Sequence, residues 1–420
     1  MRFSIPKRHL PFEIAYFVSL VILLLNQIDC LPMAETLRKV KYPYVLFVAI
    51  LVVINPKVKR GIKASLFVIL MLLLHNYLYS HIFVNGIVVA AIEENTSQML
   101  WFLLFVLVTF LYVAQNNFYK GFILLSYYAT GLQLVVAAIK YRSNFVNPLW
   151  ALIHAFTADT RFKNAFGFIH PGYTSNACFT VIVISIFFFE MYRKTEEFKK
   201  LWFWISFLVI DGLAGCMLMA ATERSGIIST FMVVFWYLFF VFFNIRFERK
   251  TLWILLGIAA AVLAIFIASG GFGKIWGESN RELNITVNYP LFVNYGSFWT
   301  GLGFIENAGF HADRNLFPMP TSSLDMYYVY IFFSTGLLGT IMIGLVLVVI
   351  LVKLLINKRT NMNIIAIGFF LTMLFFAIWQ SNLFTHRYIS SYVISVIFLC
   401  TMCKDCCMGE TECTDIKSMV

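Results

Sequence analysis

Charged side chains are scarce in this chain. Asp, Glu, Lys and Arg make up 13% of its 420 residues, whereas soluble globular proteins carry about 25%. Hydrophobic residues make up 60% of the chain, and they fall in blocks of about 17–25 residues, the length that crosses about 30 Å of hydrocarbon as a helix. This composition excludes a soluble fold and predicts an all-α polytopic membrane protein.

The sequence also lacks any sign of further domains. No period of 20–50 residues recurs, and no soluble domain or low-complexity linker is visible, so we expect residues 1–420 to form a single integral membrane domain. The apolar runs predict about twelve spans, near residues 12–28, 43–54, 64–80, 99–114, 119–139, 174–192, 201–221, 225–243, 252–269, 325–352, 364–380 and 384–402.

The first apolar run is not typical of a cleaved signal peptide. It is too long for a secretory core, and no small-residue cleavage site follows it. We therefore expect residues 12–28 to be retained as the first span.

Acidic residues are outnumbered, with 21 Asp and Glu against 32 Lys and Arg, which gives a net charge of +11. With twelve spans, most of the cations fall on the side of the N-terminus, which predicts that both termini are cytoplasmic. The remaining cations gather in two long outer loops, residues 140–173 and 270–324, and at tight turns. Loops of this length are usually functional or disordered, and their tryptophans, phenylalanines and glycines favour function, with short helices inside them.

Cysteine is concentrated at the C-terminal end of the chain, at Cys400, Cys403, Cys406, Cys407 and Cys413. A C-x-x-C-x-x-C spacing can ligate zinc or an iron–sulfur cluster. However, the first two cysteines end a span and no histidine lies near, so reduced thiols on a cytosolic tail are the favoured interpretation. We predict no metal site and no cofactor.

A charged pair, Glu223 and Arg224, stands where two apolar runs almost meet. Two interpretations stay open at this point. Arg224 is a turn residue that snorkels to the interface beside Glu223, or its guanidinium is held at the membrane surface for an anionic headgroup. Arginine suits phosphate because its planar fork makes two parallel charge-assisted hydrogen bonds.

Two further stretches carry charge on the predicted outer face. Arg161, Lys163 and His170 precede the predicted span at 174–192. Pro171 and Gly172 are expected to break the backbone at the membrane surface, where the aromatic Tyr173 is typical of the interface. The stretch at 296–339 holds Glu306, His311, Asp313, Arg314 and Asp325. Solvated loop residues and a helix-start acid are the ordinary interpretations of both sets.

Asp211 lies in the middle of a predicted span. A carboxyl group at that depth is costly and normally faces the bundle interior with a partner. It is either a structural hydrogen-bond hub or a proton carrier, and we favour the hub.

The order and spacing of these stretches resemble the O-antigen polymerase and ligase family of bacterial surface-polysaccharide assembly, over residues 160–340. The shared features are an outer arginine, a glycine and "HP" (Arg161, Gly167, His170, Pro171), and a turn "TERSG" that resembles "SRSG". The third is a "GxG" (Gly301, Gly303), followed by an outer acid or histidine at the start of a span that ends "GLLG". Gly172 stands where the family often has Asn. "LDMYY" stands where the ligase branch has "HN", which favours the polymerase branch.

The resemblance implies a glycosyltransferase that joins polyprenyl-diphosphate-linked oligosaccharide repeat units on the outer face of the bacterial cytoplasmic membrane. It implies membrane lipid, a chain-length regulator and a flippase as partners, and no nucleic acid. The arginines that would stabilise the diphosphate are Arg161, Arg224 and Arg314. The candidate bases are Asp325, ranked first, His170, Glu223 and His311. Aromatic side chains that can stack on sugars are Trp150, Tyr173, Trp276 and Trp299.

Three other functions remain open. A ligase would use the same donor with another acceptor, and a flippase for lipid-linked oligosaccharides also has about twelve spans. A flippase is expected to show two related halves and charges along a central path, whereas the candidate charges here gather at one face. A purely structural membrane protein is disfavoured by the two long outer loops.

Overall fold

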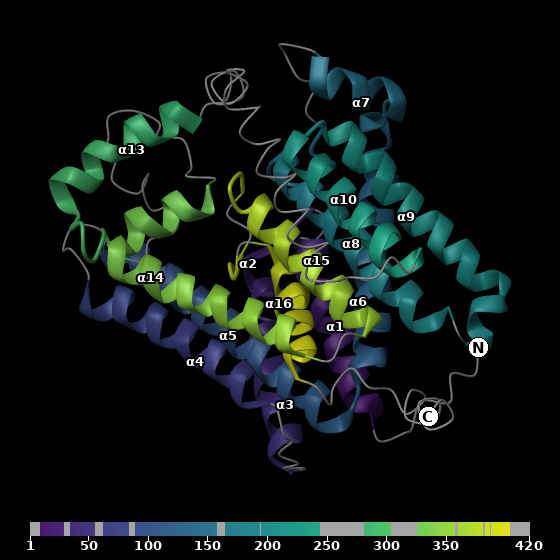
Figure 1. The fold of residues 1–420 in the computed structure, drawn as a ribbon, viewed down its shortest axis with the longest axis horizontal. Helices are drawn as coiled ribbons and strands as arrows, with labels where there is room; N and C mark the ends of the chain where they lie inside the picture. The colour runs from purple at the N-terminus through teal and green to yellow at the C-terminus, as the bar shows by residue number, and fades with distance from the viewer. Residues whose placement is uncertain are drawn as a thin grey trace.

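The computed structural model describes residues 9–28, 34–54, 62–83, 89–157, 164–193, 195–243, 281–303, 326–357, 360–380, 383–386 and 388–403. Within these ranges every regular element is a helix, and an isolated β-bridge joins Ser297 to Gly301. The fold is all-α (Figure 1).

The helices of the first half are α1 (Leu10–Asn26), α2 (Ala34–Arg38), α3 (Lys41–Ile54), α4 (Ile62–Tyr77), α5 (Val89–Asn116), α6 (Tyr119–Lys140), α7 (Pro148–Thr157) and α8 (Pro171–Tyr192). Those of the second half are α9 (Leu201–Ala221), α10 (Arg224–Tyr237), α13 (Arg281–Tyr295), α14 (Tyr327–Ile356), α15 (Asn361–Phe376) and α16 (Ile389–Met402). Short helical turns are η2 (Leu78–Ile82), η3 (Arg142–Asn144), η4 (Glu196–Lys199) and η5 (Leu238–Phe242).

Seven helices of the described ranges are long and apolar enough to cross a membrane: Ile62–Ile82, Ser97–Asn116, Tyr119–Lys140, Pro171–Tyr192, Leu201–Ala221, Arg224–Phe242 and Tyr327–Ile356. Four more predicted spans are helices of 14–17 residues, namely α1, α3, α15 and α16. The predicted span at 252–269 lies outside the described residues. The membrane architecture therefore agrees with the prediction, but the count of about twelve is not confirmed.

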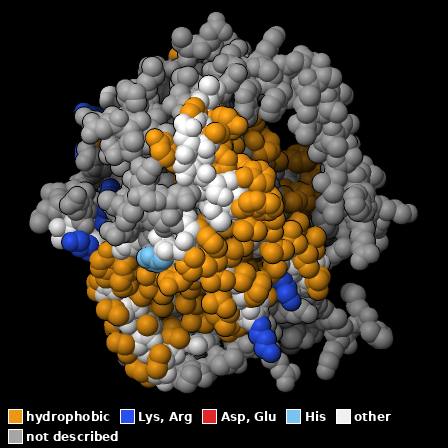
Figure 2. Space-filling view, turned by 90° about the vertical axis from the view of Figure 1, so that its left-hand side faces the viewer, with side chains coloured by type: hydrophobic (Ala, Val, Ile, Leu, Met, Phe, Trp, Pro, Cys, Tyr) orange, Lys and Arg blue, Asp and Glu red, His pale blue; other side chains and the backbone are white. Residues whose placement is uncertain are grey.

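The surface agrees with a lipid environment. Figure 2 shows a face on which hydrophobic side chains cover most of the described surface, with the visible lysines and arginines near its margins. Helix α14 contributes exposed Leu338, Ile341, Leu345 and Val348, at spacings of three and four residues. An apolar stripe of this kind faces a core in a soluble protein, so its exposure here favours contact with lipid.

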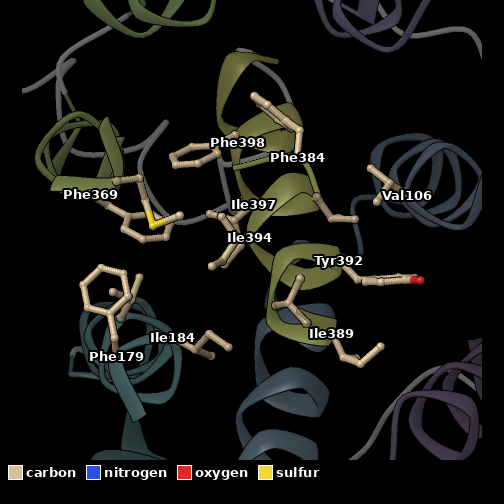
Figure 3. Close-up of a cluster of buried hydrophobic side chains, with 14 of the residues drawn as sticks. Val106, Phe179, Ile184, Phe369, Phe384, Ile389, Tyr392, Ile394, Ile397 and Phe398 are labelled. Atoms are coloured by element: carbon tan, nitrogen blue, oxygen red, sulfur yellow. The ribbon is translucent and has the colours of Figure 1, made fainter. Parts of the chain in front are cut away.

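The core lies between α5, α8, α15 and α16 (Figure 3). Phe398 stacks on Phe369 with ring centroids 4.9 Å apart, and Tyr392 meets Phe102 edge-on at 4.7 Å. Offset and edge-on geometries are the favoured ones for aromatic pairs. These contacts join residues that are far apart in the chain into one packed bundle.

The two ends of the bundle differ. At one end, the carboxylate of Glu190 on α8 accepts from Asn361 at 2.7 Å and pairs with Arg193 at 2.8 Å. A buried carboxylate is tolerated when it is bonded in this way. At the other end α8 and α10 begin, and we call this the site end.

Helix α14 is kinked at Gly336, which has φ +59° and ψ −163°. Its first residue donates to Ala377 O of α15 at 3.1 Å, and its Leu354 O accepts from Asn363 at 2.7 Å. A straight helix over 327–354 would extend about 40 Å, whereas residues 363–377 extend about 21 Å. The kink lets α14 contact α15 at both of these points.

Both long loops contain helices, as predicted. The loop at 140–173 holds η3 and α7, and the loop at 270–324 holds α13. Figure 1 shows α7 beside the ends of α9 and α10, and α13 beside α14.

Candidate functional site

The turn between α9 and α10 places the charged pair. Helix α9 ends at Ala221 and is followed by Thr222, which closes it in the left-handed conformation with a φ of +50°. Glu223 follows in an extended conformation, and α10 begins at Arg224. The side chain of Glu223 is 6% exposed. The turn is therefore tight, and it places a buried carboxylate beside the positive end of the α10 dipole.

Arg224 is oriented by a third element. Its Nε donates to the carbonyl oxygen of Ala155, in the last turn of α7, at 2.6 Å. The last carbonyls of a helix lack partners inside that helix, and the negative end of the helix dipole favours a cation. The guanidinium is therefore held in one orientation, and this differs from a side chain that only snorkels.

The start of α8 positions His170. Its Nδ1 accepts from the backbone N–H of Gly172 at 3.0 Å, so the imidazole caps the helix, and Pro171 takes the first helical position. The side chain is otherwise exposed. This bond uses the lone pair of Nδ1, so it places the proton of a neutral ring on Nε2, which is left as a donor.

The chain before His170 is tied to the bundle. Thr174 Oγ1 donates to Ala165 O at 2.7 Å, and Gly167 has φ +81°. A Cβ at Gly167 would overlap the ring of Tyr141 and lie 2.8 Å from Ile28 O. The glycine of the predicted motif thus has a packing reason.

The structure brings the first two predicted stretches together. Helices α8 and α10 pack side by side, and Gly226 lies against Ser175 so closely that a Cβ at Gly226 would overlap the Ser175 hydroxyl. Because both helices start at the same end, His170, Glu223 and Arg224 all lie at the site end.

Two residues that the sequence analysis did not name, Gln380 and Tyr388, complete this end together with Tyr173. Tyr388, at the start of α16, donates to Gln380 Oε1 at 3.2 Å. Gln380 lies beside Gly172, where an added Cβ would be 2.8 Å from its Nε2. The ring of Tyr173 packs on Tyr388 at 4.4 Å. In the sequence, Gln380 is noticeable only as a polar residue directly after the apolar run of α15. The sequence does not indicate which residues lie beside it.

Buried hydroxyl groups extend inward from these helix starts. Ser175 and Thr180 on α8, and Ser225, Ser229 and Thr230 on α10, are at most 8% exposed. None of these hydroxyls bonds to the described residues. Buried polar groups without partners are costly, so this region suits water or the oxygen atoms of a ligand.

The other predicted site residues lie outside the described residues. These are Arg161, Lys163, Glu306, His311, Asp313, Arg314 and Asp325, together with Trp276. The described residue that follows them, Met326, is buried. Its neighbour Tyr327 donates to Ala377 O at 3.1 Å, three residues before Gln380.

The predicted "GxG" and "GLLG" motifs contact each other. Leu302 and Gly303 donate backbone N–H groups to Phe333 O and Ser334 O, at 2.9 and 2.8 Å. In return, Leu337 donates to Phe298 O at 2.9 Å. The carbonyl and N–H groups that the kink in α14 releases are therefore satisfied by the loop, as a helix break in a membrane requires.

Glycine is required on both sides of this contact. Gly301 has φ +70°, and its Cβ would lie 2.5 Å from Ser334 O. Gly336 would place a Cβ 2.5 Å from Thr300 N. The paired backbones hold Trp299, which is 57% exposed, at the surface beside the kink.

Asp211 in α9 lies in a hydrogen-bonded setting. Tyr127 of α6 donates its hydroxyl to Asp211 Oδ2 at 2.9 Å, and Ser185 of α8 also bonds to the carboxyl group. Three helices therefore meet at this side chain, which favours the structural hub over the proton carrier.

The described cysteines carry thiol groups rather than disulfide bonds. Cys178, Cys400 and Cys403 are buried, and Cys216 is partly exposed. The described ranges contain no group of three or more His, Cys, Asp or Glu side chains that could hold a metal. Cys406, Cys407 and Cys413 lie outside them.

No family model matches the chain, and no curated protein matches it. The residues of the site define its chemistry. It combines an oriented guanidinium, a buried carboxylate, an exposed imidazole and unbonded hydroxyl groups at the ends of apolar helices. Such a set can neutralise an anionic group at headgroup depth and accept a proton beside it.

Proposed function

We propose that this protein is a polysaccharide polymerase, a glycosyltransferase that joins polyprenyl-diphosphate-linked oligosaccharide repeat units on the outer face of a bacterial cytoplasmic membrane. The observation that carries the proposal is that His170, Glu223 and Arg224 lie at the starts of two helices that pack against each other. The motif resemblance over residues 160–340 supports it.

The reaction breaks the bond between the anomeric carbon of the donor sugar and the diphosphate, which leaves with the electron pair. A hydroxyl oxygen of the acceptor repeat unit bonds to the anomeric carbon and loses its proton to a base. Arg224 stabilises the charge that develops on the diphosphate. A donor that is already oriented lowers the barrier most, because it needs no reorganisation during the reaction, and the Ala155 carbonyl supplies that orientation.

Within the described residues, His170 and Glu223 are the candidate bases. His170 is exposed, but the nitrogen that can accept a proton in its neutral ring is Nδ1, which must first release the Gly172 N–H. Glu223 is buried beside Arg224. His170 is the more accessible of the two to a polymeric substrate, which arrives from solvent. Asp325, His311, Arg161 and Arg314 keep their proposed roles as bases and diphosphate ligands.

The test is polymer synthesis by purified protein supplied with lipid-linked repeat units in detergent, with products separated by length. We expect Arg224→Lys and Arg224→Ala each to lower the rate by about 10²–10³-fold, the usual cost of removing one charge-stabilising donor. Lysine keeps the charge but loses the fork, so it should not restore the rate.

Two controls separate catalysis from folding. Arg142→Gln removes an exposed arginine of the same loop region and should leave the rate unchanged. Asn147→Ala removes the cap of α7 but keeps Arg224. If Asn147→Ala loses as much activity as Arg224→Ala, the role of Arg224 is to hold α7 and the phosphate role is refuted.

The same assay separates the alternatives. Longer glycans formed in detergent require an enzyme, whereas a flippase leaves the repeat units unchanged. A ligase would transfer the glycan only when a different acceptor is added.

A further inference from the structure

Helix α7 has one apolar face that the protein leaves uncovered. Leu149, Trp150, Ile153 and Phe156 are 47–68% exposed, and their spacing places them on one side of a helix. On the opposite side Ala151 and Ala155 are fully buried, and α7 packs on α9. The small residues face the protein, and the large apolar residues face outward.

Both ends of α7 are fixed. At its start, Asn147 Oδ1 accepts from the backbone N–H groups of Leu149 and Trp150, at 3.0 and 3.2 Å. At its end, the Ala155 carbonyl accepts from Arg224. The exposed apolar face therefore belongs to an ordered helix, and isolated helices of this length are marginal without such contacts.

The position of α7 sets its depth. Helix α6 ends at Lys140, shortly before α7 begins in the chain. The last turn of α7 is bonded to Arg224, the first residue of α10. Lys140 and Arg224 are each at the end of a candidate span. Figure 1 shows α7 at the top, beside the ends of α9 and α10. Helix α7 thus lies level with the boundary of the apolar bundle.

The neighbouring surface is also apolar. Ile228 and Phe231 lie one and two turns into α10 and are 37% and 53% exposed. Helix α10, whose first residue is bonded to α7, therefore also presents apolar side chains at the surface. A helix with one apolar face at this level fits the boundary between headgroups and acyl chains.

We propose that α7 is an interfacial helix that lies in the outer boundary of the lipid bilayer, with Leu149, Trp150, Ile153 and Phe156 among the lipids. Trp150 suits this position because its ring is apolar and its N–H reaches water. One consequence is that the bilayer surface, through Ala155, fixes the depth of Arg224. This inference does not depend on the proposed glycosyl transfer.

The test is a nitroxide spin label on Ile153→Cys, with the full-length protein in phosphatidylcholine–phosphatidylglycerol liposomes. Frequent collision of the label with oxygen indicates that it lies in lipid, and frequent collision with a water-soluble nickel chelate indicates that it lies in water. Ile139→Cys, in the last turn of α6, marks the end of a span, and Glu196→Cys, in an exposed turn, marks water. The wild-type chain gives the background from native thiols.

We expect the label at 153 to have the same accessibility to oxygen and to the nickel chelate as the label at 139. Its collisions with nickel should be at least about threefold fewer than those of the label at 196. Nickel accessibility equal to that at 196 would overturn the proposal, because α7 would then face water. Low accessibility to both reagents, with spin–spin broadening that disappears on dilution with unlabelled protein, would also overturn it, because a second copy would then cover the face.

A double variant gives an independent check. Ile153→Ser with Phe156→Ser removes apolar area without touching Ala151 or Ala155. The quenching by brominated lipids that is due to Trp150 is the difference between a protein and the same protein with Trp150→Phe. We expect this difference to be smaller in the double variant than in the wild-type chain. Unchanged quenching would contradict the proposal.

Discussion

Gly226 of α10 lies directly against Ser175 of α8, so that a single added carbon at Gly226 would overlap the serine hydroxyl. This contact sets how closely the two helices approach at the site end. Small residues permit close backbone approach in membrane bundles, where packing rather than hydrophobic burial drives association. The distance between His170 and Arg224 therefore depends on Gly226.

The first prediction concerns this glycine. We expect Gly226→Ala to destabilise the protein by about 1–3 kcal/mol, the usual cost of overpacking, and to lower its thermal unfolding temperature in detergent. Adding Ser175→Gly should recover part of the loss, because it removes the overlapping hydroxyl. Gly212→Ala and Gly215→Ala, with no atom within 4 Å of the new carbon, are the controls and should be neutral or slightly stabilising.

The second prediction concerns the contact between the loop and the kinked helix. Gly301→Ala and Gly336→Ala each place a Cβ 2.5 Å from backbone atoms at a positive φ. We expect each substitution to lower the yield of folded protein strongly. The double variant should lose less yield than the two single losses added together, because both substitutions break the same contact. Gly344→Ala in the same helix has open space and should behave as wild type. Simple additivity would show that the two glycines act separately.

The third prediction tests Tyr388. In Tyr388→Phe the ring still packs on Tyr173, but the hydrogen bond to Gln380 is lost. We expect a stability loss of about 1 kcal/mol, measured by thermal unfolding. If Gln380 also positions the substrate, KM for the lipid-linked repeat should rise more than kcat falls. If neither the unfolding temperature nor KM changes, this bond has no role in stability or in substrate binding.

The fourth prediction separates the two interpretations of Asp211. Asn keeps an oxygen that can accept from Tyr127, so a structural hub predicts that Asp211→Asn is folded and active. Asp211→Leu leaves the Tyr127 hydroxyl without its acceptor and should cost about 1–3 kcal/mol. A stable but inactive Asp211→Asn protein would instead identify a proton carrier. Thermal unfolding and polymer synthesis on the same preparations decide between them.

The candidate site was only partly predictable. Glu223 and Arg224 stood out because charge between two apolar runs is a local feature of the sequence. Gln380 and Tyr388 did not, because their roles depend on α8, α15 and α16 meeting at one end. Helix α8 is buried on nearly every side, so its pattern could not indicate which neighbour each face contacts.

The sequence by itself determined that the chain is helical and suited to a membrane. The length and apolarity of a segment are local properties, and they decide whether the segment can cross the bilayer as a helix. It also determined where the turn between α9 and α10 falls, at "TERSG", whereas the break expected at Pro171 and Gly172 is the first turn of α8. Only the tertiary structure decided that Arg224 bonds to the end of α7, and that the "GxG" loop satisfies the kink of α14. Those bonds join backbone groups far apart in the chain, and which groups meet depends on how whole helices pack rather than on any local pattern.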